Sequence, residues 1–393
     1  MTQPTTYGTV TKTFHWLTSA LILAIIPLGI IASDMAYATN EQLAQKAYLF
    51  SWHKTLGVAV FFVALLRIIW ALTHAKPAPL HPERKAQTLL AEMIHWLLYS
   101  ALVITPLTGW ISHAAQTGFA PIWWPFGQSL PFVPKDETVA HLFDSLHWVF
   151  GKVMIGSVLL HIAGAVKHVV IDRDSTLRRM WFGKTAMPDT AHHRAPASAP
   201  LLAALIVAAG IGTAFALSGG EEDTPQAAAL EQVASDWTVQ DGTLGITVKQ
   251  FGKTVQGSFA DWTAAITFDP DAATDAGDVT VTVNIGSLTL GSVTDQAMGA
   301  DFFNVADFPT ATFTAPITRT ESGYIADGTL TLKGQTAPLA LAFTLTLDGS
   351  TATMRAQTTL NRMTYAIGQT MTDESNLGFD VVVDVDLTAT QGQ

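Results

Sequence analysis

The sequence predicts an all-α bundle of four transmembrane helices with one extra transmembrane helix, followed by an all-β antiparallel domain. Hydrophobic residues make up 49% of the 393 residues and charged residues only 13%, which is too apolar for a soluble protein of this length. Residues 1–220 hold 15 Lys and Arg against 10 Asp and Glu, whereas the rest of the chain is strongly acidic. The hydrophobic periodicity also changes from long apolar runs to strict alternation after about residue 236.

Five apolar stretches each have about the 20 residues that a helix needs to cross a bilayer. The first is a true span and not a cleavable signal peptide, because it is long, contains a histidine and leads into further spans. The fifth ends in the small-residue sequence AFALSGG, so cleavage near Ala216 remains an alternative. The stretches are roughly Phe14–Ala32, Trp52–Leu72, Leu89–Ile111, Trp148–Val170 and Leu201–Leu217.

Cations indicate the orientation of these spans. They gather between spans two and three and again after span four, and the positive-inside rule makes both loops cytoplasmic. The fifth span then delivers the acidic remainder to the periplasm of a bacterial cell, which makes this a multi-pass inner-membrane protein. The cations are Lys76, Arg84 and Lys85 in the first loop, and Arg173, Arg178, Arg179, Lys184 and Arg194 in the second.

Alternating residues predict β-strands in the acidic part. Val279, Val281 and Val283 alternate with polar residues, and the same pattern recurs in LALAFTLTL and in residues 379–387. Turn sequences such as DPDAATDAGD and KGQ separate the strands, so we expect an antiparallel sheet closed into a barrel or a sandwich. The predicted domains are a membrane domain at 1–185, a linker at 186–235 containing the fifth helix at about 201–217, and a β-domain at 236–393.

The histidines of the membrane domain form two pairs. His147 and His161 are fourteen residues apart, which is a rise of about 21 Å and a rotation of about 1400°, so they share one helix face at two depths. His15, in a span that enters from the cytoplasm, lies at the inner level with His161. His53, in a span that enters from the periplasm, lies at the outer level with His147. A lone histidine would more simply hydrogen-bond between helices, but matched pairs favour a cofactor.

A b-type haem fits these pairs, because it needs only two axial imidazoles and an apolar slot. The chain has no cysteine, which excludes thiolate ligands and thioether attachment. We therefore expect two haems, one iron between His15 and His161 and the other between His53 and His147. Gly57 and Gly151, each four residues after an outer histidine, would leave room for the porphyrin. Arg67 either pairs with a haem propionate or reaches the cytoplasmic head groups.

The membrane domain resembles the bacterial cytochrome b561 family over about residues 7–185. The resemblance rests on FHWLTSALIL, WHKTLGVAVFFVALLRIIW, EMIHWLLYSALVITPLTGW and SLHWVFGKVMIGSVLLHIAGAVKHVVIDRDSTLRRMW. It implies two b haems ligated by the four histidines and electron exchange with the quinone pool. Some members are similar to superoxide oxidases, which makes superoxide:ubiquinone oxidoreductase one candidate activity.

Further side chains are candidates for substrate contacts. His95 and His168, near the cytoplasmic boundary, could protonate or hydrogen-bond a ubiquinone carbonyl, or could simply be wetted by head groups. Lys54, Lys135 and Lys152 could attract superoxide to the outer haem. Lys152 could instead meet a propionate or extend toward the membrane surface.

The β-domain resembles the YceI-like family over residues 236–390. The motifs are GSFADWTAAITFDP, VNIGSLTLG, DFFNVADFPTATF, GTLTLKGQTAPLALAFTL and LNRMTYAIG. The resemblance implies a lipocalin-like barrel whose interior holds a polyisoprenoid chain. An Arg-Asp pair expected in this family is missing, with only Asp295 kept. The aromatic residues Phe302, Phe303, Phe308 and Phe313 either line the lumen or its mouth, or belong to the core.

Together these features predict a membrane dihaem cytochrome that moves single electrons between the periplasmic face, with superoxide as donor, and the ubiquinone pool. The barrel would bind an isoprenoid quinone or a similar lipid. Two alternatives stay open: an isoprenoid carrier or sensor anchored by a cytochrome, and a passive electron relay for a partner dehydrogenase. The expected partners are the bilayer, the quinone pool, an isoprenoid lipid and a periplasmic electron donor, with no nucleic acid among them.

Overall fold

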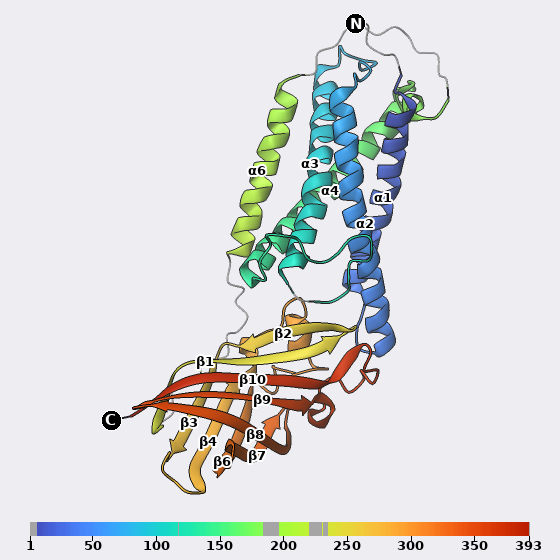
Figure 1. The fold of residues 1–393 in the computed structure, drawn as a ribbon. Coiled ribbons are helices and arrows are strands. Elements are labelled where there is room, and N and C mark those ends of the chain that lie inside the picture. The colour runs from blue at the N-terminus through green and yellow to red at the C-terminus, as the bar shows by residue number, and fades with distance from the viewer. Residues whose placement is uncertain (1–5, 117, 184–195, 220–229, 231–234, 393) are drawn as a thin grey trace. The chain divides into compact units, whose positions relative to one another are not determined.

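The computed structural model describes residues 6–116, 118–183, 196–219, 230 and 235–392. The chain divides into a helical unit and a β-unit, drawn in Figure 1. Of the predicted linker, residues 186–195, 220–229 and 231–234 lie outside the described residues.

Among the described residues, the helical unit contains the five predicted membrane helices. Each helix contains its predicted span and is long and apolar enough to cross a bilayer. A short helix, α5 (Thr176–Met180), follows the fourth span. The five long helices are α1 (Thr9–Asp34), α2 (Asn40–Thr73), α3 (Lys85–Ala115), α4 (Glu137–Val170) and α6 (Ser198–Ser218).

Two of these helices begin well before their apolar spans. α2 starts at Asn40 and α4 starts at Glu137, both among polar residues. The carboxylate of Asp136 accepts a hydrogen bond of 2.9 Å from Val139 N and so caps the first turn of α4. Hydropathy finds the part of a helix that lies in lipid, whereas capping decides where the helix begins.

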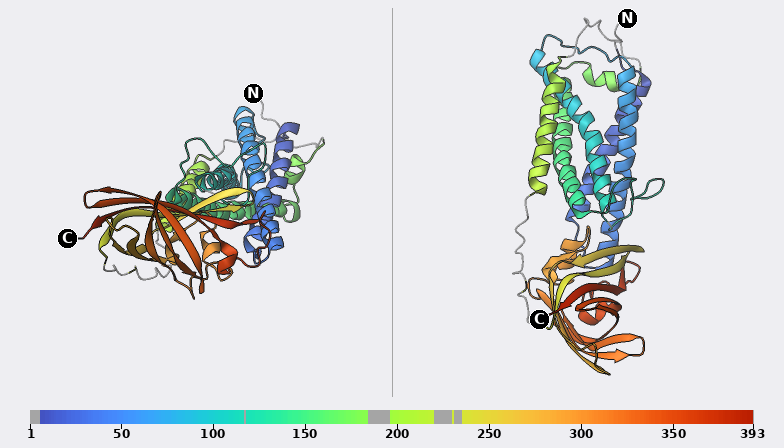
Figure 2. Two further views of the ribbon diagram at one scale, coloured as in Figure 1. Left: turned by 60° about the horizontal axis from the view of Figure 1, so that its bottom comes forward. Right: turned by 60° about the vertical axis from the view of Figure 1, so that its left-hand side comes forward.

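The fifth long helix packs on α3 and α4, on the side away from α1 and α2, as the views in Figures 1 and 2 agree. Gly210 brings α6 close to α4, since a Cβ at this position would lie 3.3 Å from the ring of Phe150. The two helices share a buried cluster of Leu146, Val149, Phe150 and Ala214. The other four helices meet around a second cluster of Ile22, Val60, Ala64, Ala101, Leu102 and Met154.

The β-unit is one antiparallel sheet of ten strands in the order β3-β4-β6-β7-β8-β9-β10-β1-β2-β5. It curls into a half-barrel, which confirms the predicted lipocalin-like class, with β3 and β5 left as the two ends of the ladder. The strands are β1 (Trp237–Gln250), β2 (Lys253–Phe259), β3 (Trp262–Phe268), β4 (Asp275–Asn284), β5 (Leu288–Thr289), β6 (Thr310–Thr320), β7 (Gly323–Leu332), β8 (Gln335–Asp348), β9 (Thr351–Asn361) and β10 (Leu377–Gln391).

The curl brings β3 across β1. Asp236 N donates to Ile266 O over 3.0 Å, and a Cβ on Gly242 would lie 2.8 Å from the ring of Trp262. Glycine is required at this crossing because a side chain would push the two strands apart. Two short elements connect strands of the sheet. The helix α7 (Thr294–Met298) lies between β5 and β6, and the 3-10 turn η2 (Arg362–Tyr365) lies between β9 and β10.

Candidate functional site

The two histidine pairs predicted from helix periodicity come together in the structure. The ring centres of His53 and His147, the outer pair, are 6.2 Å apart, and those of His15 and His161, the inner pair, are also 6.2 Å apart. Imidazole nitrogens bind transition metals at about 2 Å, so an iron between two rings separates their centres by roughly 6 Å. Both pairs therefore fit an axially ligated haem iron.

Backbone carbonyls orient the outer pair. Nδ1 of His53 donates to Ile25 O over 2.9 Å, and Nδ1 of His147 donates to Thr105 O over 2.8 Å. A hydrogen bond from Nδ1 fixes the tautomer and leaves the Nε2 lone pair free to bind a metal. The outer rings are thus held in the protonation state that an iron ligand needs.

A glycine makes room for each outer ring. A Cβ on Gly29 would lie 2.7 Å from Cε1 of His53, and one on Gly109 would lie 2.7 Å from Nδ1 of His147. Each glycine stands four residues after the carbonyl that binds the ring, and each helix carries a proline within this turn, where the helical ladder is interrupted. Neither glycine is among the predicted site residues, although the sequence marks each with a proline shortly before it inside an apolar span, IIPLG and TPLTG.

The two glycines predicted to leave room for a porphyrin differ in their surroundings. A Cβ on Gly151 would meet nothing within 4 Å, whereas Gly57 is buried and a Cβ on it would meet Cδ1 of Ile25 at 3.4 Å. The space beside Gly151 lies one turn after His147, where a haem bound by that histidine would need room for its ring.

The inner pair has a different environment. Nδ1 of His15 is buried and has no hydrogen-bond partner among the described residues. Arg67 is half-buried, its guanidinium lies 5.5 Å from the ring centre of Tyr99, and its charge acts on both inner histidines. A cation at this depth usually has an anionic partner, and a haem propionate has the required charge.

The two quinone candidates lie in different surroundings. The ring centre of His95 is 5.2 Å from that of His161, and His95 is exposed. Both ring nitrogens of His168 are engaged, Nδ1 with Asp174 at 2.6 Å and Nε2 with Gln87 at 3.1 Å. The structure therefore brings His95 to the inner pair and places His168 in a polar network.

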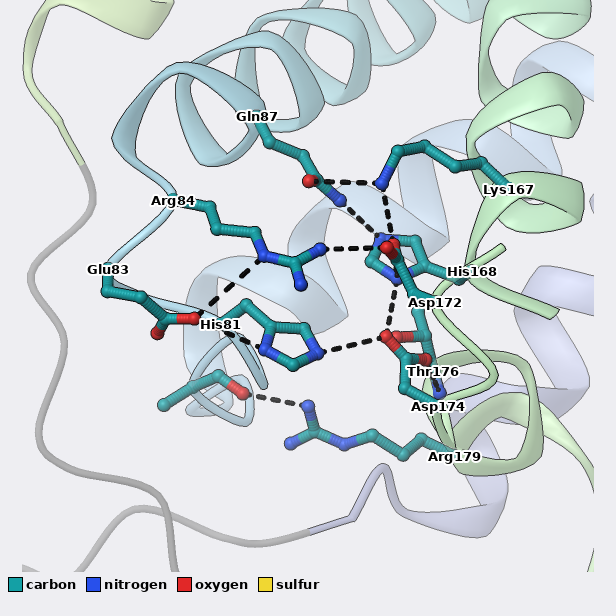
Figure 3. Close-up of polar contacts among 11 residues, drawn as sticks. His81, Glu83, Arg84, Gln87, Lys167, His168, Asp172, Asp174, Thr176 and Arg179 are labelled. Carbon is teal, nitrogen blue, oxygen red and sulfur yellow. Dashed lines mark hydrogen bonds and ion pairs between the residues drawn. The ribbon is translucent and has the colours of Figure 1, made fainter. Parts of the chain in front are cut away.

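This network, the inner polar cluster, joins the start of α3 to the end of α4 and the chain before α5, as Figure 3 shows. Asp172 accepts from Lys167 at 2.6 Å and from Arg84 at 2.8 Å. His81 also approaches Asp174, at 3.3 Å. The cluster consists of His81, Glu83, Arg84, Gln87, Lys167, His168, Asp172, Asp174 and Thr176.

The hydrogen bonds and ion pairs of this cluster lower the pKa values of two of its carboxyl groups, Asp172 and Asp174. Hydrogen bonds from Lys167 and Arg84 hold the pKa of Asp172 well below its usual range. Burial alone would raise the pKa of Asp174, but hydrogen bonds from Thr176 and His168 outweigh this and lower it. Both carboxylates therefore stay ionised and keep the two helix ends together. Three ligand atoms, of His168, Asp172 and Asp174, lie within 4.8 Å of one another, but Lys167 and Arg84 already balance their charge.

The three lysines predicted to attract superoxide do not form one group. Lys54 Nζ lies 3.3 Å from His113 Nδ1 and Lys135 Nζ donates to Gln116 O over 2.5 Å, so both contact the C-terminal end of α3. Asp144, on α4, hydrogen-bonds the same end through Gln116 at 3.2 Å and offsets part of this positive charge. Lys152 lies elsewhere, 5.3 Å from the ring centre of Trp148.

The β-unit encloses an apolar cavity of about 290 Å³. Valine, isoleucine, leucine, phenylalanine and alanine from the inner faces of the strands form most of its wall. Of the four aromatic candidates, Phe302, Phe303 and Phe313 line it. Phe308 does not line the cavity. Its ring packs against Gly334 in the turn between β7 and β8, where a Cβ on Gly334 would lie 2.8 Å from Cε1 of Phe308. Such a cavity suits a long apolar ligand.

Comparisons with known proteins agree with this division of the chain. Residues 6–183 match the family model of prokaryotic cytochrome b561, and residues 237–389 match that of the YceI-like domain. Cytochrome b561 homolog 2 of Escherichia coli is 28% identical over 185 residues, which are 47% of this chain and 94% of that protein.

The β-unit has its own relatives. A UPF0312 protein of Yersinia pestis is 35% identical over 126 residues, 30% of this chain and 65% of that protein. The crystal structure of Burkholderia cenocepacia BcnA is 27% identical, with a TM-score of 0.36, and covers 38% of this chain and 96% of that one. The cytochrome b561 family implies b-type haem and a bacterial membrane. The chain therefore carries a prokaryotic cytochrome b561 domain at residues 6–183 and a YceI-like domain at residues 237–389.

Proposed function

We propose that this chain is a dihaem cytochrome of the bacterial inner membrane that moves single electrons from periplasmic superoxide to the ubiquinone pool. The observation that carries the proposal is the equal separation, 6.2 Å, of the ring centres in the two histidine pairs. Fourteen residues of α4 separate His147 from His161, which is about 21 Å of helix. Two sites at this spacing would cover most of a hydrocarbon core of about 30 Å.

The haems, when bound, supply one-electron carriers. His53 with His147, and His15 with His161, would hold the two haems, and the carbonyls of Ile25 and Thr105 keep the outer rings in the metal-binding tautomer. Arg67 would pair with a propionate of the inner haem.

The overall reaction balances with two superoxide ions for each ubiquinone. Each superoxide loses one electron and becomes dioxygen, and ubiquinone gains two electrons and two protons to become ubiquinol. We assign the contact with the quinone carbonyl to His95, because His95 lies beside His161 and is exposed. His168 suits this contact less well, since Asp174 and Gln87 engage both of its nitrogens.

Superoxide is an anion, so a positive group near the outer pair would raise its local concentration. Lys54 follows His53 directly in α2, and Lys135 meets the same end of α3. These two lysines are the proposed entrance. Lys152, which lies over Trp148, is assigned a lesser part.

The β-unit, in this proposal, lies in the periplasm and binds an isoprenoid quinone or a similar lipid in its apolar cavity. The cavity wall supports this, because it offers an extended apolar surface and few polar groups. Tethering such a domain to the cytochrome raises the effective concentration of its ligand at the membrane.

Stopped-flow spectroscopy of the purified full-length protein tests the electron-transfer proposal. Superoxide should reduce the oxidised haems rapidly, and ubiquinone should reoxidise them. His147→Ala should remove the outer haem and abolish reduction by superoxide, whereas His141→Ala, which changes an exposed histidine of the same helix, should leave both haems and the rate unchanged. Reduction only by a partner dehydrogenase would contradict the proposal and favour a passive relay.

Mass spectrometry of lipids that co-purify with the full-length protein tests the β-unit. We expect an isoprenoid in the wild-type protein and its loss from Val383→Trp, because Val383 lines the cavity. Val382→Trp is the matched control, since the neighbouring residue is not part of the cavity wall. An isoprenoid that both variants retain would show that the cavity is not its binding site.

A further inference from the structure

Two glutamines form a polar end in the otherwise apolar cavity of the β-unit. Gln250 and Gln296 both line the cavity, and Gln250 is only 6% exposed. Oε1 of Gln250 and Nε2 of Gln296 are buried and have no hydrogen-bond partner among the described residues. Buried amide groups are nearly always paired, because an unpaired one costs its full desolvation free energy. The two amides therefore point to a ligand that pairs with them.

The position of Gln250 on its strand supports this. Ile246, Val248 and Gln250 are the alternate buried residues at the end of β1, and all three line the cavity. The first two are apolar, as an inward face requires. A leucine at position 250 would pack as well as the glutamine, so packing alone does not explain the amide of Gln250.

The two glutamines lie at the same end of the cavity. Gln250 stands opposite Leu377 of β10, and Leu377 O accepts from Arg362 at 3.1 Å. A Cβ on Gly368 would lie 3.1 Å from Nη1 of Arg362 and 3.0 Å from the ring of Phe302. These contacts connect β1 to the wall formed by Phe302.

Phe302 in turn leads to the other glutamine. Phe302 N donates to Gly299 O over 3.0 Å, and Gly299 N donates to Gln296 O over 3.2 Å. The end of β1, the turn η2 and the helix α7 thus surround one end of the lumen. Trp237 stands at the opposite end of β1, about 40 Å of strand away, and packs on Phe268 in an aromatic group. A long ligand would place its tail toward the aromatic group and its head at the glutamines.

The chemistry of this end excludes an anionic head group. Arg362 is the only cation in the described wall of the cavity, and five backbone carbonyls already occupy its guanidinium. No hydrogen of this group is left for a phosphate. The available partners are one amide oxygen, which needs a donor, and one amide N–H, which needs an acceptor.

We propose that Gln250 and Gln296 bind the hydroxyl head group of an isoprenoid, so that the cavity selects a quinol or an isoprenoid alcohol over an oxidised quinone or a hydrocarbon. This rests on the proposed isoprenoid binding by the β-unit. A hydroxyl donates to Oε1 of Gln250 and accepts from Nε2 of Gln296. A quinone carbonyl can satisfy only Gln296, and a hydrocarbon satisfies neither.

Equilibrium binding to the full-length protein in detergent tests the assignment with two pairs of probes. Farnesol and the hydrocarbon farnesene differ in the hydroxyl, and a short-tailed ubiquinol and its quinone differ in redox state. The binding of each probe to Val383→Trp measures association outside the cavity, and this background is subtracted from its binding to the wild-type protein. We expect farnesol to bind about tenfold more tightly than farnesene, since a hydrogen bond to a buried amide is worth about this factor, and ubiquinol to bind more tightly than the quinone.

Gln250→Leu and Gln296→Leu should each reduce the preference for both hydroxyl probes to within about twofold, with farnesene affinity unchanged. Gln256→Leu makes the same change at an exposed position of β2 and should keep the wild-type preference. A preference that survives in both glutamine variants overturns the head-group assignment while isoprenoid binding stands. Farnesene binding equal in wild type and Val383→Trp overturns the proposed lumen site itself. Preference for farnesol without preference for ubiquinol identifies the alcohol as the source of the hydroxyl.

Discussion

At the scale of single residues, the outer histidines are positioned by backbone groups of neighbouring helices. Each ring donates to a carbonyl, and each carbonyl is followed four residues later by a glycine. The same arrangement thus occurs twice, once between α1 and α2 and once between α3 and α4. Both glycines are needed because the histidine ring occupies the place of a Cβ.

Gly29→Ala and Gly109→Ala should each displace an outer histidine and lower the occupancy of the outer haem by more than half. The added Cβ would lie 2.7 Å from the ring in both cases, and neither the helix backbone nor the ring can move freely. The measurement is haem content per protein, with the absorption spectrum separating the two haems. Gly156→Ala is the control, because a Cβ there meets nothing within 4 Å. Full occupancy in both variants would show that these rings are not iron ligands.

Asp172 should be the main acid-sensitive group of the inner polar cluster. Its side chain is 7% exposed, against 65% for Glu83, and Lys167 and Arg84 lower its pKa. A carboxyl group with a lowered folded pKa stabilises the protein above its unfolded pKa of about 4, and this contribution is lost as pH falls toward the folded pKa.

Asp172→Asn should therefore lower the melting temperature at pH near 7 and flatten its decrease below pH of about 4, measured by heating the detergent-solubilised protein. Glu83→Gln removes an exposed carboxylate from the same cluster and should have a smaller effect, because exposed ion pairs contribute little. Equal melting curves for wild type and Asp172→Asn would mean that the cluster does not hold the helix ends together.

At the scale of elements, α6 is a part of the helical unit and not only a connection to the β-unit. Its small residues face α3 and α4, and a Cβ on Gly210 would lie 3.3 Å from Phe150 and 3.5 Å from Val149. Small residues allow membrane helices to approach closely, where packing replaces the hydrophobic effect as the source of association.

Gly210→Leu should destabilise the helical unit by about 1–3 kcal/mol, the usual cost of overpacking. Gly212→Leu makes the same change two residues later, where a Cβ would meet nothing within 4 Å, and should be neutral. Thermal unfolding followed by haem absorbance compares the two variants. The same midpoint for both would rule out close packing of α6 on α4.

The sequence predicted the elements better than it predicted their contacts. Long apolar runs and strict alternation are local patterns, so five helices and the strands around Val281, Leu341 and Val383 follow directly from them. The order of strands in the sheet, with β1 between β10 and β2, depends on pairings between distant segments and leaves no local signal.

The same distinction holds for the candidate site. Helical periodicity places His147 and His161 on one face, and the depth of each span pairs them with partners. The carbonyl acceptor of His53 belongs to another helix, and the amide oxygen of Gln250, which has no partner among the described residues, is evident only once the neighbours of β1 are known. Such features arise from tertiary contacts, which a single sequence does not display.

At the scale of the whole molecule, charge divides the chain between two environments. The cations of the helical unit gather in the loops after α2 and α4, whereas the β-unit is acidic. Cationic loops remain in the cytoplasm during insertion, and an odd number of spans carries the following domain across the membrane. We therefore predict that the YceI-like domain faces the periplasm.

Thiol labelling of spheroplasts checks this topology, because the chain has no cysteine and an introduced one is the only thiol. Ser350→Cys, at an exposed turn between β8 and β9, should react with a membrane-impermeant maleimide before lysis. Glu83→Cys, 65% exposed in the loop between α2 and α3, should react only after lysis. Label at the mass of the intact chain would also exclude cleavage near Ala216. Reaction of Glu83→Cys before lysis, with Ser350→Cys protected, would reverse the orientation and place the acidic domain, with the outer histidine pair, on the cytoplasmic side.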